Sequence, residues 1–326
     1  MADPSFVHEM PQLRLGVSAC LLGQEVRFDG GHKHMPFLTR VLSTYVEWVP
    51  VCPEVEVGMG IPRETIRLVG TPEKPQLVAP KSGTDYTDVM QTWAQKRLDD
   101  LGKLDLHGYV LKKDSPSCGL FRVRVYHPDT DMPNRDGSGL FAKALMDRQP
   151  LFPVEEEGRL NDLPLRENFI ERMFACYRWK KLLAENPTPG GLVAFHSTMK
   201  MCVLSHSPRH YREMGQLVAK AGVMLWNEVI TQYGQMLMAG LQVLPTPGKH
   251  VNVLMHLMGF LKDVLTSEDK VELLEVFESC RQRLIPLIVP ITLLKHHLKR
   301  HVVPDWVHQQ VYLNPYPMEL MLRNHV

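Results

Sequence analysis

The chain has 326 residues, enough for two domains at roughly 100–200 residues each. Hydrophobic residues make up 44% and charged residues 22% of it, as in ordinary globular proteins, and no apolar run reaches the roughly 20 residues that a membrane helix needs. The net charge of +1 does not by itself predict a polyanionic partner.

The N-terminus lacks a basic region followed by an apolar one, so no signal peptide is expected and a cytoplasmic location is predicted. In that reducing compartment the six cysteines are expected to be free, metal-bound or catalytic rather than paired in disulfides.

The N-terminal half alternates apolar runs with amphipathic segments, which is typical of an α/β layer fold. We expect a Rossmann-like α/β domain over residues 1–165. Strands are predicted at 13–19, 45–51, 107–111 and 151–154, and helices at 35–42, 85–101 and 140–146. Residues 71–80 are expected to form a loop with an edge strand, and the turn-rich residues 129–139 a flexible surface loop.

Beyond Leu165 the pattern becomes helical, so residues 166–326 are predicted to form a connecting helix and an all-α domain. Residues 186–191, with two prolines and two glycines, are the best linker candidate. Helices are predicted at 166–183, 192–205, 208–222, 223–241, 250–265, 267–283 and 286–300.

Three cysteines each lie where an apolar run gives way to a loop: Cys20, Cys52 and Cys118. The carboxyl ends of parallel strands converge on one crevice, so these thiols predict a metal or cluster site there. These cysteines occur singly rather than in C-x-x-C pairs, which disfavours a zinc ribbon. An iron–sulfur cluster held by only three cysteines would keep one iron open for a substrate. Core packing is the alternative for each thiol alone.

Other cysteines have a different setting. Cys176, Cys202 and Cys280 lie within helical patterns and are predicted to pack in a core. His196, Cys202 and His206 could be imagined as metal ligands, but a packed helix is the prediction.

Several motifs resemble, in order and rough spacing, those of the TudS thiouracil desulfidase family. They are Val17-Ser-Ala-Cys-Leu-Leu-Gly23, Val26-Arg-Phe-Asp-Gly-Gly31, Val51-Cys-Pro-Glu-Val55, Ile61-Pro-Arg63 and Asp114-Ser-Pro-Ser-Cys-Gly119. From about Leu192 the chain resembles the C-terminal domain of the YbgA proteins, through Phe195-His-Ser-Thr-Met-Lys200, Leu204-Ser-His206, His250-Val-Asn-Val-Leu-Met-His256, Gly259-Phe-Leu-Lys262 and Ile285-Pro-Leu287. The fused arrangement is similar to the RudS-type desulfidases, which remove sulfur from 4-thiouridine in tRNA.

The resemblance implies a [4Fe-4S] cluster with one open iron, held by Cys20, Cys52 and Cys118. It also points to Glu54, Ser115 and Asp29 as catalytic residues. Phe28 stands where many relatives have tyrosine. The substrate's soft sulfur would bind the open iron, Glu54 would act as general base for water, and Ser115 would donate a hydrogen bond.

A purely structural role remains an alternative for two of these residues. Glu54 could be a structural carboxylate paired with Arg63 or Arg27, and Asp29 could only cap the Gly30-Gly31 turn.

The resemblance also implies tRNA as the partner, and basic residues of the helical domain could contact its phosphates. A favourable charge at a helix C-terminus is the alternative for the run 295–301. No membrane or DNA partner is predicted, the oligomeric state is left open, and a free thiolated base or nucleotide, or a non-catalytic metal-containing RNA-binding role, remains a rival. The candidate RNA-binding residues are Lys200, Arg209, Arg212, Lys295, Lys299 and Arg300.

Overall fold

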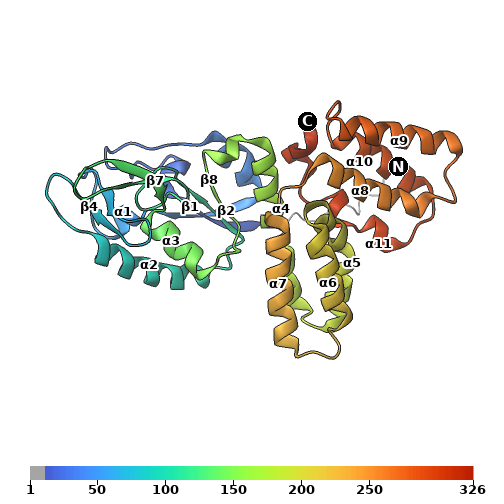
Figure 1. Cartoon of the computed structure of the whole chain (residues 1–326), viewed down its shortest axis with the longest axis horizontal. Helices are drawn as coiled ribbons and strands as arrows, with labels where there is room; N and C mark the ends of the chain where they lie inside the picture. The colour runs from blue at the N-terminus through green and yellow to red at the C-terminus, as the bar shows by residue number, and fades with distance from the viewer. Residues whose placement is uncertain (1–11, 326) are drawn as a thin grey trace. The chain divides into compact units, whose positions relative to one another are not determined.

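The computed structural model describes residues 12–325. The chain divides into two compact units between Asp162 and Leu163, an α/β unit followed by a helical one (Figure 1). In the described residues, no helix is both long enough and apolar enough to cross a membrane.

The main sheet of the first unit has four strands in the order β2-β1-β5-β8, all parallel. Its strands are β1 (Leu13–Ser18), β2 (Val46–Val51), β5 (Gly108–Leu111) and β8 (Val154–Glu156). Such strands read as nearly continuous apolar runs because both faces are covered, and β5 is buried along its whole length. The predicted Rossmann-like α/β fold is confirmed.

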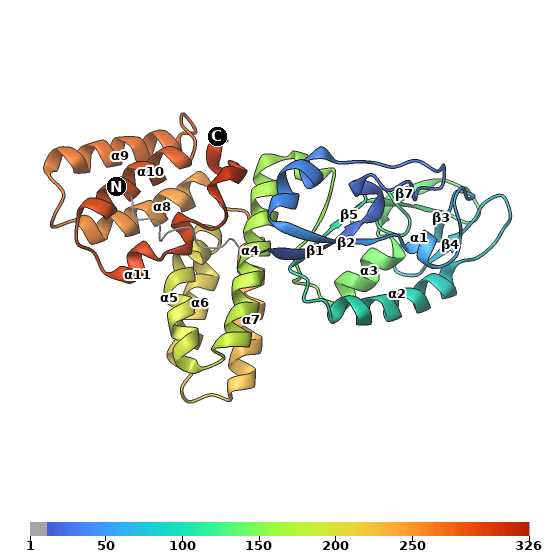
Figure 2. The same ribbon diagram turned by 180° about the vertical axis from the view of Figure 1, so that it is seen from behind.

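Two helices, α2 (Thr87–Gly102) and α3 (Leu140–Arg148), pack against each other along one side of this sheet (Figures 1 and 2). Their apolar residues form one core with the strands, including Ala94, Leu98, Tyr109 and Phe141. Gly16 on β1 makes room for the Tyr109 ring, because a Cβ atom there would lie 2.1 Å from Cδ2 of the ring. The sheet thus holds the strand ends at a fixed spacing.

The strand order brings the site together. From β1 the chain passes to β2 at the sheet edge, and β5 then pairs with the opposite side of β1. The order therefore reverses at β1, and in open α/β sheets ligands bind outside the carboxyl ends of the strands at such a point. The loops after β1, β2 and β5 share that edge.

A second sheet, in the order β4-β3-β6-β7, was largely absent from the predictions. It contains β3 (Arg67–Gly70), β4 (Pro75–Val78), β6 (Val123–Tyr126) and β7 (Pro133–Gly137). The edge strand expected within residues 71–80 is present as β4. The prediction of a surface loop at 129–139 was wrong in part, because β7 pairs antiparallel with β6. This pairing with a neighbouring strand overrides the turn-forming composition of the segment.

Other boundaries also shifted. The helix predicted at 35–42 is a short π-helical turn, Phe37–Val41, followed by a 3₁₀ turn, Leu42–Thr44. The last strand, predicted at 151–154, is β8 and lies two to three residues later. Short helical turns also follow β1 and β2, at η2 (Ala19–Leu22) and α1 (Pro53–Glu56).

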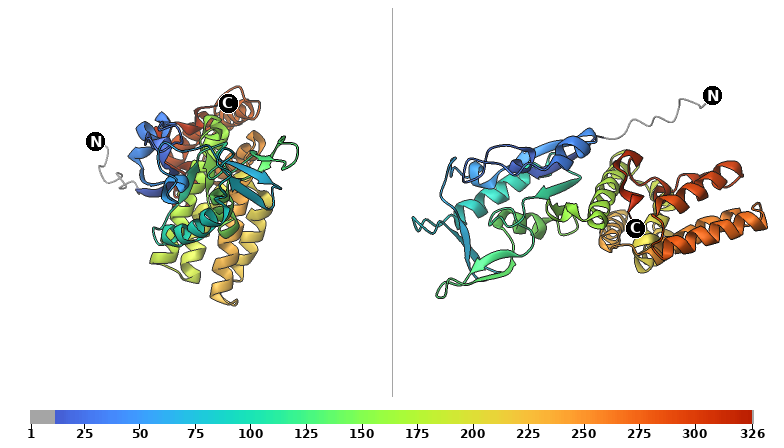
Figure 3. Two further views of the ribbon diagram at one scale, coloured as in Figure 1. Left: turned by 90° about the vertical axis from the view of Figure 1, so that its left-hand side faces the viewer. Right: turned by 90° about the horizontal axis from the view of Figure 1, so that it is seen from above.

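The second unit is helical as predicted. Its longer helices are α4 (Leu163–Glu185), α5 (Pro189–His206), α6 (Pro208–Ala219), α7 (Trp226–Gln242), α8 (Pro247–Met258), α9 (Ser267–Arg281) and α10 (Ile288–Arg300). The short α11 (Asp305–His308) and 3₁₀ turns at 259–261, 311–313, 318–320 and 322–324 complete it. Helices α5, α6 and α7 lie side by side, and α8 contacts both α9 and α10 (Figures 1 and 3).

A repeated dipeptide starts three of these helices. Thr188, Ser207 and Thr246 each precede a proline at the first helical position, and each side chain accepts a hydrogen bond from a backbone N–H of the first turn. Such a cap contributes about 1 kcal/mol, and proline loses no hydrogen bond at that position. The predicted linker at 186–191 is therefore the turn between α4 and α5 and the start of α5.

Candidate functional site

Three thiols line one cavity at the carboxyl edge of the main sheet. The cavity has a volume of about 470 Å³, and Cys20, Cys52 and Cys118 all contribute to its wall, as do Glu54 and Ser115. Cys20 follows β1 within η2, Cys52 directly follows β2 as the N-cap of α1, and Cys118 lies in the loop after β5. The sequence predicted this convergence from the strand ends alone.

The Cys118 loop is held by backbone and serine hydrogen bonds. Ser115 Oγ accepts from the Cys118 N–H at 3.1 Å, and the Ser115 carbonyl accepts from the Gly119 N–H at 2.8 Å. The first turn of α3 anchors the same loop, because the Phe141 N–H donates to the Ser117 carbonyl at 3.0 Å. The loop that carries Cys118 is therefore held in place by the first turn of α3 as well as by β5.

Burial keeps the three thiols protonated in the absence of a cation. It raises the pKa of Cys20 to about 11, outweighing the opposite effect of the Lys112 and Arg27 charges. Burial also raises the pKa of Cys52 and of Cys118 above the ordinary thiol value. A thiolate is the metal ligand, so a bound cation would have to supply the charge that deprotonates these groups.

Glu54 links the cysteine loops through a network of polar side chains. One carboxylate oxygen accepts from Arg63 Nε at 3.0 Å and from Arg63 Nη2 at 2.5 Å. The other oxygen accepts from Ser117 Oγ at 2.8 Å, and Ser117 Oγ lies 3.0 Å from Ser115 Oγ. Arg63 Nη2 also donates to the carbonyl of Val26, which lies 3.7 Å from Cys52 Sγ.

Two of these residues were not selected as site residues from the sequence. Ser117 is fully buried and lies next to a cysteine, and Arg63 was considered only as a structural partner of Glu54. Both lie within motifs that resemble those of the TudS family, and this position could have identified them as site residues. Only the fold brings the loop after β5 to the segment after α1.

Asp29 lies apart from the other predicted catalytic residues and is not among those that line the cavity. Its carboxylate accepts from the Gly31 N–H at 3.1 Å and from Arg27 Nε at 3.4 Å. The hydrogen bond from Gly31 lowers the pKa of Asp29. Gly30 adopts a φ of +74°, so Asp29 closes a tight turn, which is the second role considered for it.

The cavity wall is cationic. It carries six Lys or Arg side chains and two carboxylates: Arg27, Arg63, Arg67, Lys112, Lys113 and Arg124, with Glu54 and Asp114. Two aromatic rings, Phe28 and Tyr126, also line it, and the Arg67 guanidinium lies 4.7 Å from the Tyr126 ring centre. Such a wall suits a flat ring on an anionic backbone.

The basic residues predicted to bind RNA are divided between two places in the helical unit. Lys200 on α5 and Arg212 on α6 line one open groove of about 530 Å³ together with Tyr211. Arg209, also on α6, is exposed and pairs with Glu213 at 2.7 Å. Lys200 lies 4.0 Å from the Trp306 ring centre.

The remaining three lie on α10. Lys295 Nζ donates to Asn314 Oδ1 at 2.7 Å, whereas Lys299 and Arg300 are exposed near the C-terminal end of the helix. Arg300 Nη1 lies 3.4 Å from His296 Nε2.

Fold and site together define a two-unit protein whose α/β unit presents three thiols, a carboxylate and hydroxyls at the strand ends. A family model described as 2-thiouracil desulfurase matches residues 15–157, and a second, of a protein family of unknown function called DUF1722, matches residues 200–317.

Two curated proteins are similar to this chain. The uncharacterized protein YbgA of Escherichia coli (strain K12) is 31% identical over 162 residues, which are 48% of this chain and 94% of YbgA. The uncharacterized protein YbbK of Bacillus subtilis (strain 168) is 30% identical over 152 residues, 45% of this chain and 97% of YbbK. A solved structure described as the [4Fe-4S]-dependent thiouracil desulfidase TudS is 30% identical, covers 46% of this chain and 95% of its own, and superposes with a TM-score of 0.38.

The chain therefore belongs to the 2-thiouracil desulfurase family, to which a DUF1722, YbgA-like domain is joined.

Proposed function

We propose that this protein is a [4Fe-4S]-dependent desulfidase that removes sulfur from 4-thiouridine in tRNA, giving uridine and hydrogen sulfide. The observation that carries the proposal is the convergence of Cys20, Cys52 and Cys118 on one cavity beside Glu54. Membership of the desulfurase family supports the reaction class. The cationic wall and the basic helical unit support an anionic substrate.

The cavity residues fit a cluster. Ligand sulfurs of one tetrahedral zinc ion lie about 3.8 Å apart. Within the described part of the chain, the sulfur atoms of Cys20, Cys52 and Cys118 do not all lie within 4.8 Å of one another, so they are too far apart to surround a single zinc ion. A cluster spreads its irons over a larger volume and takes one thiolate at each iron. When bound, the cluster would supply an open iron that polarises the carbon–sulfur bond of the substrate as a Lewis acid.

The protein's own residues would position the base and handle protons. Arg63 fixes one oxygen of Glu54, so the carboxylate stays turned toward the Ser117 hydroxyl. In the proposed reaction Glu54 accepts a proton from the attacking water, directly or through the hydroxyls of Ser117 and Ser115. In the direct route, Ser115 would turn its proton from Ser117 toward the cavity and donate it in a hydrogen bond to the substrate. Hydrolysis of this kind requires no net electron supply.

The helical unit would bind the tRNA body. A thiolated base must leave its stack to reach a loop-lined cavity. Contacts between the helical unit and the phosphate backbone of the tRNA would stabilise that exposed form. Lys200, Arg212 and Tyr211 combine charge with a ring at one groove, and Arg209 adds charge on the same helix as Arg212. The protein would work in the cytoplasm, where reducing conditions preserve thiolate ligands.

Turnover measured on two substrates after anaerobic cluster reconstitution tests the proposal. We expect the full chain to process 4-thiouridine in tRNA with a much higher kcat/KM than free thiouracil. The double variant Lys200→Gln/Arg212→Gln should lower kcat/KM on tRNA and leave the rate on thiouracil unchanged. Lys262→Gln, an exposed lysine outside the groove, is the matched control and should change neither rate. Faster turnover of the free base, unaffected by the double variant, would refute the tRNA assignment and support the nucleobase enzyme.

Metal analysis separates both enzymes from a non-catalytic RNA-binding protein. Iron and sulfide should be present in anaerobically purified wild type and fall sharply in Cys20→Ala, Cys52→Ala and Cys118→Ala. A wild type that contains zinc, has no turnover and loses no RNA affinity in these variants would refute a desulfidase.

A further inference from the structure

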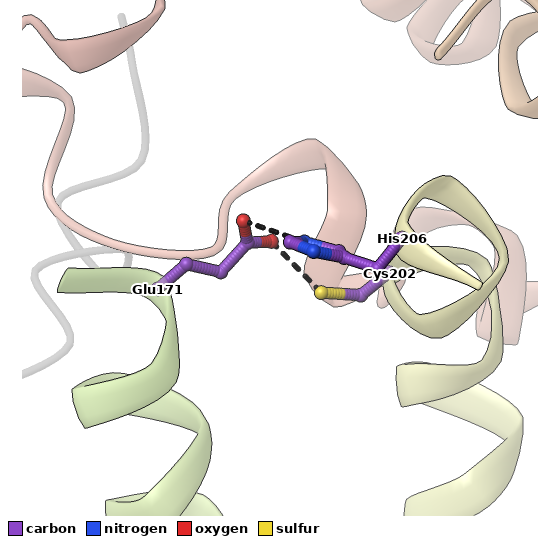
Figure 4. Close-up of side chains that lie close together, drawn as sticks. All are labelled: Glu171, Cys202 and His206. Atoms are coloured by element: carbon purple, nitrogen blue, oxygen red, sulfur yellow. Dashed lines mark hydrogen bonds and ion pairs between the residues drawn. The ribbon is translucent and has the colours of Figure 1, made fainter. Parts of the chain in front are cut away.

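A second group of metal-ligating side chains lies inside the helical unit. Glu171 on α4 and Cys202 and His206 on α5 place a carboxylate oxygen, a thiol sulfur and a ring nitrogen within 4.8 Å of one another (Figure 4). Cys202 and His206 are completely buried, and Glu171 is 3% exposed. The desulfidase chemistry proposed above uses none of the three.

The local structure fits a metal ligand set. Cys202 and His206 are four residues apart, so both side chains leave α5 on the same face and point toward Glu171 (Figure 4). Cys202 Sγ lies 2.9 Å from Glu171 Oε1, and His206 Nε2 lies 3.0 Å from Glu171 Oε2. Ligand atoms around a tetrahedral zinc ion are about 3.3–3.7 Å apart, so each of these two contacts would have to lengthen by less than about 1 Å to admit the ion.

The second nitrogen of His206 is held as in a metal-bound histidine. His206 Nδ1 lies 2.7 Å from the carbonyl oxygen of Val243, which accepts its N–H. A metal-bound histidine ordinarily donates its other ring N–H to a carbonyl or carboxylate, which fixes the tautomer and directs the free lone pair to the ion. Here that lone pair would be on Nε2, the atom that faces Glu171.

A cavity of about 240 Å³ lies beside the group on the side of Glu171 and is also lined by Asn168 and His250, among others. Cys202 and His206 are not part of its lining, so in the proposed site the ion and a water molecule as fourth ligand would enter past Glu171.

We propose that Glu171, Cys202 and His206 form a binding site for a divalent transition metal of borderline softness, zinc in the first place. The thiolate and the carboxylate carry two negative charges, which match the charge of the ion, and His206 binds as the neutral imidazole. Binding releases the thiol proton of Cys202, and the proton that His206 shares with Glu171, to solvent. The site would join α4 to α5 across the turn at residues 186–188.

The alternative is an internal hydrogen-bond network without metal. In that arrangement the Cys202 thiol donates to Glu171 and a charged His206 donates to the other oxygen, so every group is satisfied. The two arrangements differ in metal content and in the state of the sulfur, both of which can be measured.

The experiment uses the full-length Cys20→Ala/Cys52→Ala/Cys118→Ala protein, so that the thiols of the α/β unit cannot bind the metal. After incubation with zinc and extensive dialysis, we expect one zinc ion per chain, together with a Tm raised by several degrees relative to chelator-treated protein. Co²⁺ in place of zinc should produce a thiolate-to-metal charge-transfer band.

Cys202→Ser in the same background should lose the bound zinc and the cobalt band. Cys176→Ser is the matched control, a buried cysteine on α4 outside the ligand group, and should keep both. Absence of zinc from the parent protein, with a Tm that zinc does not raise, would overturn the proposal even if Cys202→Ser failed to fold. Retention of the metal and the band in Cys202→Ser would overturn it as well. Neither result depends on desulfidase activity.

Discussion

Replacing Gly139 by alanine tests whether the first turn of α3 positions the Cys118 loop. Gly139 is the N-cap of α3, and its N–H donates to the Gly119 carbonyl at 2.7 Å. A Cβ atom at this position would lie 2.5 Å from the carbonyl carbon of Ser117 and 2.8 Å from the backbone nitrogen of Cys118. These are backbone atoms, so no flexible side chain can move aside.

The size of the effect follows from these distances. Ordinary van der Waals contact begins at 3.4 Å, so the Ser117–Cys118 peptide must move by about 0.9 Å, the difference between 3.4 and 2.5 Å. Overpacking of this kind costs roughly 1–3 kcal/mol. For a unit of this size about 2 kcal/mol lowers Tm by roughly 4–8 °C. A displacement near 1 Å at a reacting site lowers activity by about 100-fold.

Thermal unfolding, iron and sulfide content, and turnover after anaerobic reconstitution measure the effect. We expect Gly139→Ala to have a lower Tm, less iron per chain and much slower turnover than wild type. Gly102→Ala, at the end of α2, is the control, because nothing lies within 4 Å of a Cβ there. If Gly139→Ala matched wild type in Tm and iron content, the anchoring of the cysteine loop by α3 would be refuted.

Three further predictions concern the charged groups. Glu54→Gln keeps the shape of the side chain but removes the base, so kcat should fall by about 100-fold or more while the iron content stays at the wild-type value. Arg63→Met leaves Glu54, which is 14% exposed, without its cation, so the free energy of unfolding in urea should fall by about 3–5 kcal/mol; a loss below about 1 kcal/mol would show that the pair is not structural. Burial, aided by the Lys200 charge, lowers the pKa of His196 to about 4, below the ordinary value of 6.5. The unfolded chain therefore binds more protons than the folded one between pH 6.5 and 4, so the contribution of His196 to stability is complete above pH 6.5 and is lost as the pH falls through that range. Between pH 7 and 5 this amounts to about 1–2 kcal/mol, and His196→Gln should lose correspondingly less stability than wild type over the same range in urea unfolding; equal losses would contradict it.

Local patterns were sufficient to predict most of the framework. Apolar, β-branched runs ending at Gly or Pro located β1, β2 and β5, and the parallel order of these strands placed Cys20, Cys52 and Cys118 at one edge. Helical periodicity located the helices of the second unit, and the structure added that three of them begin at Ser/Thr-Pro dipeptides. These features depend on neighbours within a few residues, and sequence reasoning is strongest at that range.

The second sheet could not be predicted in the same way. Residues 133–137 carry prolines, charges and a glycine, yet they form β7 because β6 offers unpaired backbone groups alongside.

Long-range partners of side chains were decided by the tertiary structure. The sequence suggested that Glu54 lies beside a metal ligand and is a candidate base. It did not reveal that Ser117, 63 residues away, donates to it, and it left open whether Asp29 is catalytic or caps the Gly30-Gly31 turn, which its carboxylate does.

The helical unit shows the same division. Cys202 was predicted to pack in a core, and a packed helix was preferred to a metal site formed by His196, Cys202 and His206. Glu171 was not considered, because it belongs to another helix and 31 residues separate it from Cys202. A one-dimensional pattern encodes which face of a helix is buried. Which side chains meet across that face depends on how two helices pack, and the packing is a property of the whole fold.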